Sequence, residues 1–107
     1  MRALAALPIA LALLAAACSQ NEHGKKVIAE QCIAEGETIE VCECLAKASA
    51  ERLDPELFDM VVLGAQGEDA ETAARMEELP PELKVKFTVV VPDILRGCGA
   101  EGYLAGS

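Results

Sequence analysis

Four of the five cysteines in this 107-residue chain lie where they could share chemistry. Cys32, Cys42 and Cys44 fall within the stretch CIAEGETIEVCEC, and Cys98 lies near the carboxyl end. Cysteine side chains at this density can form disulfides, exchange disulfides with other proteins or bind a metal ion as thiolates. The choice among these depends on the redox compartment, which the first residues of the chain indicate.

The opening residues MRALAALPIALALLAAACSQ have the layout of a secretory signal peptide. One basic residue, Arg2, precedes an uncharged run over residues 3–17 that ends in small side chains. A membrane-spanning helix needs about 20 consecutive apolar residues, and this run is shorter. We therefore expect residues 1–17 to be a signal peptide that is removed on export, and the thiols that follow to meet an oxidising compartment.

The alanines before Cys18 fit two modes of cleavage. Ala15 to Ala17 satisfy the small-x-small rule for ordinary secretion, and the same residues followed by Cys18 resemble the lipobox of bacterial lipoproteins. The sequence departs from that pattern at Ala15, where the family usually has leucine. The resemblance implies that Cys18 becomes the acylated first residue, and that residues 18–24 form the lipidated cysteine and a polar tether to a domain over residues 25–107.

Ser19, which follows that cysteine, bears on localisation. In Gram-negative lipoproteins a residue other than Asp at this position usually accompanies sorting to the outer membrane. The resemblance therefore implies a protein held by N-terminal acyl groups such as palmitate in the cell outer membrane, facing the periplasm. Its membrane contact would be made through that lipid.

Committing Cys18 to lipid leaves an even number of thiols, which in a small exported domain indicates two disulfides. If residues 39–53 are helical, Cys42 and Cys44 point about 200° apart and must reach different partners. The simplest arrangement pairs Cys32 with Cys42 and Cys44 with Cys98. The alternative pairs Cys32 with Cys44 and Cys42 with Cys98, and connectivity cannot be deduced from sequence alone.

The pattern of apolar residues predicts an antiparallel helical hairpin at the start of the domain. One helix is expected over residues 25–35, ending at Gly36, and a second over residues 39–53, with Thr38 as its N-cap. Their inward faces are predicted to carry Ile28, Ala29, Cys32 and Ile33 in the first helix, and Ile39, Cys42, Ala46, Ser49 and Leu53 in the second.

Helix-start signals recur further along the chain. A third helix is expected to begin at Asp54–Pro55, with an inward face made of Leu57, Phe58, Val61 and Val62. A fourth helix, short and exposed, is expected over residues 68–78 and should pack through Ala73 and Met76. Residues 84–91 alternate as a strand would, but the stripe Leu83, Phe87, Val90, Val91, Ile94 and Cys98 favours a helix. The expected fold class is all-α, a small bundle of four or five helices cross-linked by two disulfides.

Two alternative roles for Cys32, Cys42, Cys44 and Cys98 remain, a thiol-redox site and a metal site. Glu40 and Glu43 disfavour the thiolate form of Cys44 that redox exchange needs. Zinc sites usually space paired cysteines by two to four residues, whereas CEC has one. The only histidine, His23, falls in the expected tether, so no nucleophile and histidine pair is predicted. We expect no catalytic residue, metal or cofactor.

The negative net charge of the chain limits the classes of partner that we expect it to bind. Removal of residues 1–17 takes away one basic residue, Arg2, and changes the formal net charge from −9 to −10. Such an excess of acidic residues argues against binding to nucleic acid. It is typical of a solvated surface, or of a surface that binds a cationic partner. CEC with a distant Cys98 resembles small exported helical bacterial proteins of no assigned role. The expected function is a non-catalytic cell-envelope lipoprotein, an interaction or structural module whose protein partner is unknown.

Overall fold

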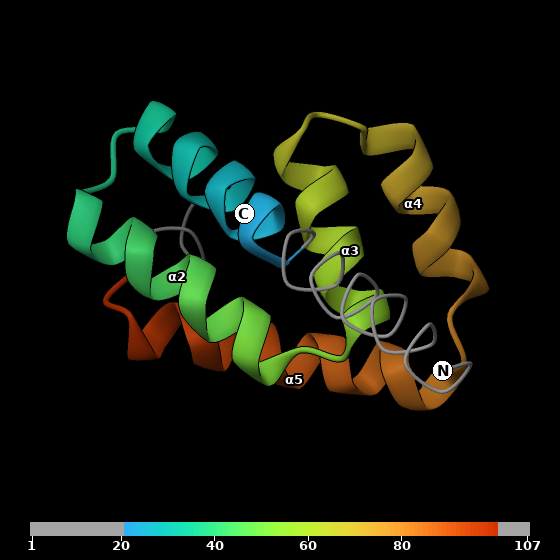
Figure 1. Ribbon diagram of the computed structural model, residues 1–107. Coiled ribbons are helices and arrows are strands. Elements are labelled where there is room, and N and C mark those ends of the chain that lie inside the picture. The colour runs from blue at the N-terminus through green and yellow to red at the C-terminus, as the bar shows by residue number, and fades with distance from the viewer. Residues whose placement is uncertain (1–20, 101–107) are drawn as a thin grey trace, which may run out of the picture.

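The computed structural model describes residues 21–100, and within that range the chain is helical with no strand (Figure 1). The first helix, α1, occupies residues 21–34 of the described part. The remaining helices are α2 (Ile39–Arg52), α3 (Pro55–Ala65), α4 (Asp69–Glu78) and α5 (Pro81–Gly97). The prediction of an all-α bundle of four or five helices is confirmed.

The connections between the helices follow from local chemistry. After α1, Gly36 adopts a φ of 98°, and the amides of Gly36 and Glu37 donate to the carbonyls of Ile33 and Cys32 at 3.0 and 3.3 Å. This is the Schellman arrangement, which favours glycine because a left-handed φ crowds a Cβ. The Thr38 hydroxyl then accepts from the Val41 amide at 3.2 Å and caps α2. The two helices therefore reverse direction within four residues and form the predicted hairpin.

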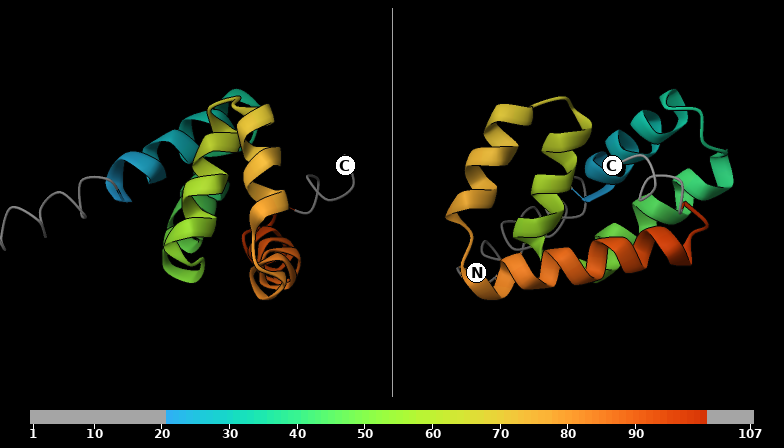
Figure 2. Two further views of the ribbon diagram at one scale, coloured as in Figure 1. Left: turned by 90° about the vertical axis from the view of Figure 1, so that its right-hand side faces the viewer. Right: turned by 180° about the vertical axis from the view of Figure 1, so that it is seen from behind.

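The helices are arranged as two hairpins beside one long helix. α1 packs against α2, and α3 against α4, while α5 packs along α2 (Figures 1 and 2). In the right-hand view of Figure 2, α5 crosses the near side of the molecule with no described helix in front of it. One face of α5 is thus available to the core and the opposite face is not covered by another helix.

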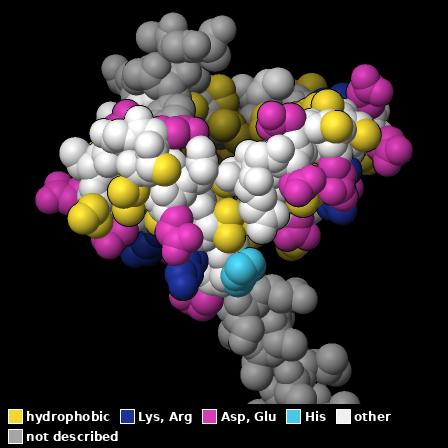
Figure 3. All heavy atoms as spheres, turned by 90° about the horizontal axis from the view of Figure 1, so that it is seen from above, with side chains coloured by type: hydrophobic (Ala, Val, Ile, Leu, Met, Phe, Trp, Pro, Cys, Tyr) yellow, Lys and Arg dark blue, Asp and Glu magenta, His cyan; other side chains and the backbone are white. Residues whose placement is uncertain are grey.

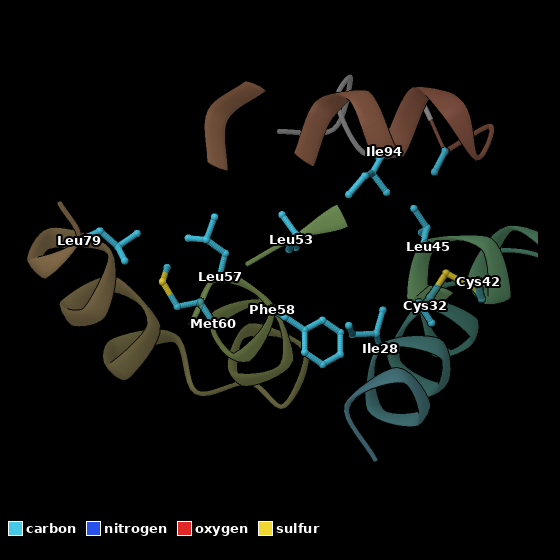
Figure 4. Close-up of a cluster of buried hydrophobic side chains, with 12 residues drawn as sticks. Ile28, Cys32, Cys42, Leu45, Leu53, Leu57, Phe58, Met60, Leu79 and Ile94 are labelled. Atoms are coloured by element: carbon cyan, nitrogen blue, oxygen red, sulfur yellow. A yellow bond between two sulfur atoms is a disulfide. The ribbon is translucent and has the colours of Figure 1, made fainter. Parts of the chain in front are cut away.

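The core runs between these helices (Figure 4). Ile28, Leu45 and the Cys32–Cys42 disulfide lie at one end, and Leu57, Met60 and Leu79 lie at the other. Between them, Phe58 from α3 approaches Ile28 from α1, and Ile94 comes from α5. Small and medium side chains thus fill most of the interior, as close helix packing allows.

Two residues predicted to face inward do not. Ile33 is 45% exposed and Ile39 is 61% exposed, because both lie beside the turn that connects α1 and α2, where no other described helix covers them. Conversely, Leu45 and Met60 are buried although the predicted faces omitted them. Neighbouring helices approach α2 and α3 from more than one side, which a single stripe in the sequence does not show.

The strand alternative for residues 84–91 is wrong, since α5 continues from Pro81 to Gly97 through Pro92. Its predicted inner stripe is confirmed, with Ile94 at 3% exposure and the other stripe residues half-buried. In α4, the half-buried residues are Thr72 and Met76, and Ala73 is exposed. The helix is therefore exposed as predicted but is rotated slightly relative to the expected contact face.

Residues 21–24, which the sequence analysis assigns to a polar tether, are helical. Gly24, placed in the tether by its composition, is buried against the ring of Phe58 in α3. An added Cβ there would lie 2.5 Å from Phe58 Cε2 and 3.0 Å from Val62 Cγ2. Glycine is thus required by the close approach of α1 to α3, a contact that no local pattern indicates.

We predict that Gly24→Ala lowers the free energy of unfolding. In an open helix this change would stabilise by up to about 1 kcal/mol, but overpacking a buried site typically costs about 1–3 kcal/mol. Gly64→Ala is the matched control, because the nearest atom to an added Cβ in α3 is Thr72 Cγ2 at 4.0 Å. Thermal unfolding followed by circular dichroism should show a lower Tm for Gly24→Ala and an unchanged or higher Tm for Gly64→Ala. Equal Tm shifts in the two variants would contradict the close contact.

Candidate functional site

The four cysteines of the described residues form two disulfides that share helix α2. Cys32 in α1 is bonded to Cys42, with Cα atoms 5.5 Å apart, and Cys44 is bonded to Cys98, with Cα atoms 5.6 Å apart. The preferred pairing is therefore confirmed, and the alternative of Cys32 with Cys44 and Cys42 with Cys98 is wrong. Cys18 lies outside the described residues.

The helix geometry of α2 explains this connectivity. Cys42 and Cys44 are two residues apart and so leave the helix in directions about 200° apart. One direction meets α1, which the Gly36 turn has folded back alongside α2. The other meets the carboxyl end of α5, where Cys98 serves as the C-cap and Gly99, with a φ of 80°, ends the helix. A single short motif in α2 therefore fixes two helices at once.

The two disulfides differ in their surroundings. Cys32 and Cys42 are 4% and 0% exposed and belong to the core, whereas Cys44 is exposed and Cys98 is half-buried. A thiol reagent or another protein's thiolate must reach a sulfur atom in order to exchange with it. In the described domain, only the Cys44–Cys98 bond joins residues that are exposed or half-buried.

Ion pairs hold the other part of α5 near the α2–α3 junction. Arg52 Nη2 lies 2.7 Å from Asp93 Oδ2, and Lys86 Nζ lies 3.0 Å from Asp54 Oδ1. All four side chains are substantially exposed, and such surface pairs contribute only about 0–1 kcal/mol each. They orient α5 on α2 and α3, but they do not replace the covalent bond at its end.

A shallow, open hollow between α1 and α2 is the other candidate for a binding site. It is lined partly by Lys25, Lys26 and Lys47, an unusual grouping for so acidic a chain. Lys25 is paired with Glu22 at 2.6 Å, and Glu43 also lines the hollow. The local charge is thus largely balanced, and no buried polar atom points into the hollow without a partner. The hollow does not have the features of an anion site.

Residues 21–100 offer few groups for metal binding or for other chemistry. No three His, Cys, Asp or Glu side chains among residues 21–100 are grouped so that they could hold a metal ion. His23 is exposed in α1 and is visible at the surface in Figure 3, where Asp and Glu side chains are spread over the same face. No helix in this range is long and apolar enough to cross a membrane.

Comparison of the chain with protein-family models, with curated proteins and with solved structures gives no match.

The difference in exposure predicts the order in which the disulfides are reduced. When the folded protein is titrated with a small dithiol, Cys44 and Cys98 should become alkylatable at lower reductant concentration than Cys32 and Cys42, because their sulfurs are reached without unfolding. Alkylation with two isotopic labels before and after full reduction, followed by peptide mass spectrometry, assigns each thiol. Reduction of all four cysteines in one step, or of Cys32 and Cys42 first, would refute the proposed difference in access.

Proposed function

We propose that this chain is a non-catalytic lipoprotein of the cell envelope, anchored through Cys18 and exposing a disulfide-bonded helical domain to the periplasm. In this proposal the protein acts as an interaction or structural module. The acyl groups supply its contact with the membrane, and Ser19 directs it to the outer membrane. It carries no nucleic-acid site and needs no cofactor.

One observation carries the proposal, namely that four of the five cysteines pair with one another. Cys18 is then the one cysteine without a place in the domain's covalent framework, and it follows the small residues that a lipoprotein signal requires. Disulfides persist in oxidising compartments, which agrees with export. Together these features support a division of the chain into an anchor and a cross-linked domain.

The helical conformation of residues 21–24 refines this division. The first residue of this helical stretch, Asn21, is only three residues after Cys18 in the chain. Three residues of chain, even fully extended, span at most about 11 Å. The domain would therefore be held close to the membrane surface rather than on a long flexible stalk.

A second candidate function, thiol-disulfide exchange, is favoured by the exposure of Cys44. In this role a dithiol protein would reduce the Cys44–Cys98 bond and become oxidised itself. The same structure weakens the metal alternative, since sulfur atoms bonded to each other are not the thiolate ligands that zinc requires. Free Cys44 and Cys98 in protein isolated from cells and alkylated at once would favour exchange over a permanent cross-link.

We predict that Cys18→Ser abolishes incorporation of a clickable palmitate analogue when the full chain is expressed in a Gram-negative host. The variant keeps the four cysteines of the domain, so its disulfides should form and its fold should be unchanged. Cleavage after Ala17 by ordinary signal peptidase should then release it into the periplasmic fraction.

Ser19→Ala is the matched control, because it changes the neighbouring residue and leaves the acylated sulfur in place. It should keep the label and remain in the membrane fraction. An unlabelled wild-type protein, or a Cys18→Ser variant that is labelled as strongly as wild type, would overturn the anchoring proposal.

A further inference from the structure

The outer face of α5 carries two large apolar side chains that no helix among residues 21–100 covers. Val85 and Val89 are each 62% exposed, although their spacing of four residues places them side by side on one helix face. Val85 and Val89 lie on the side of α5 opposite Ile94, the buried residue of the inner stripe. Folding of the domain therefore leaves the two valines in water. Single exposed apolar residues are common, whereas an adjacent pair on one helix face forms a small apolar patch.

Charged residues of opposite sign lie at the two ends of this face. Glu82 and Arg96 are each seven residues from Val89, on its two sides along the helix. With 100° per residue, Glu82, Val85, Val89 and Arg96 fall within about 60° of arc. Among residues 21–100, neither Glu82 nor Arg96 takes part in an ion pair.

Glu82, Val89 and Arg96 are self-complementary under two-fold symmetry, whereas Val85 falls opposite Asp93. If two α5 helices pack antiparallel with Val89 on the axis, every residue meets the residue equally far from Val89 on the other helix. Glu82 then faces Arg96 of the second copy, and Arg96 faces its Glu82, which gives two equivalent ion pairs. A two-fold interface requires this kind of pairing, in which one patch is complementary to itself.

The distances allow these contacts. Seven residues of helix span about 10 Å, and helices that cross at about 20° have separated sideways by only about 4 Å at that distance from the crossing point. Long Glu and Arg side chains bridge such a gap. Valine at the crossing point is small enough for the helix axes to approach within about 8–10 Å.

We propose that the outer face of α5 is a self-association surface, on which a second copy of this chain docks its own α5 in antiparallel orientation about Val89. The charge arrangement favours a second copy over an unrelated partner, because Glu82 and Arg96 complement each other at the spacing that the symmetry demands. The proposal does not require the lipid anchor. An anchor would strengthen the association by concentrating the protein at a surface.

The contact is small, so the dimer is a weak and reversible one. Helix α5 has 17 residues and presents only part of one face, which is less than the roughly 1,000 Å² expected of a stable interface. The formal charge of −10 per mature chain also opposes close approach of two copies. Covalent trapping is therefore a better test than a direct measurement of mass.

Glu82 and Arg96 also have a role within one chain, since an acid in the first turn and a base in the last turn favour the helix dipole. The two residues are fourteen apart, which is about 21 Å along α5, so they cannot pair with each other in the same chain. Reversing both charges consequently has opposite effects in the two interpretations. It restores the ion pairs of a dimer, but it makes both charges unfavourable to the helix dipole of α5.

The test uses purified full-length processed protein with Val89→Cys, oxidised under mild conditions and followed by non-reducing electrophoresis. A cysteine on the two-fold axis meets its own copy and should form a disulfide dimer about fivefold faster than Thr88→Cys, an exposed control about 100° around the helix. In the Val89→Cys background, Glu82→Arg or Arg96→Glu alone should lower the rate about fivefold, because each places like charges opposite each other twice. The double change Glu82→Arg/Arg96→Glu should restore it.

Circular dichroism of each variant confirms that α5 remains folded, so a slow rate can be assigned to the contact. Equal rates for Val89→Cys and Thr88→Cys would mean that the collisions are random, and would overturn the proposal. A double charge reversal that cross-links as slowly as the single changes would overturn it as well, and would assign the two charges to the helix dipole or to a different partner.

Discussion

The disulfide between Cys44 and Cys98 is the constraint on which the arrangement of this domain depends. It joins residues 54 positions apart, and the loop it closes contains the later part of α2 and all of α3, α4 and α5. Helix α5 buries one residue fully, Ile94, and is otherwise held by half-buried side chains and by exposed ion pairs. The chain-entropy model gives a loop of this length about 4 kcal/mol, a large fraction of the roughly 5–15 kcal/mol by which a domain is stable.

The second disulfide acts on a smaller scale. Cys32 and Cys42 close only ten positions within one hairpin, for which the same model gives about 2.7 kcal/mol. Their burial makes them part of the core between α1 and α2. The domain thus has an inner cross-link that secures a hairpin and an outer one that secures the long helix. A module held in this way keeps the outer face of α5 in place, and that face is the surface we propose for self-association.

Much of the fold could be predicted because the signals are local. Gly36, Thr38 and Pro55 mark helix ends through backbone conformation and capping, and they do so wherever they occur. The divergence of Cys42 and Cys44 around α2 likewise follows from helix geometry. The inclusion of Gly24 in α1 was not predictable, because its composition places it in a tether and only the contact with Phe58 shows that it is buried. Nor does the sequence show which disulfide is exposed or that Val85 and Val89 lack cover, since these depend on which faces of α2 and α5 meet.

Hydrogen exchange measured on the Cys44→Ser/Cys98→Ser variant shows whether the disulfide or packing holds α5 in place. Without the covalent bond, α5 should open without unfolding of the α1–α2 hairpin, which Cys32 and Cys42 still secure. We predict that α5 amides exchange up to about 1,000-fold faster than in the wild-type protein, and that amides near Cys42 change less. Protection of α5 at the wild-type level would contradict the account, because the helix would then be held by packing and not by the disulfide.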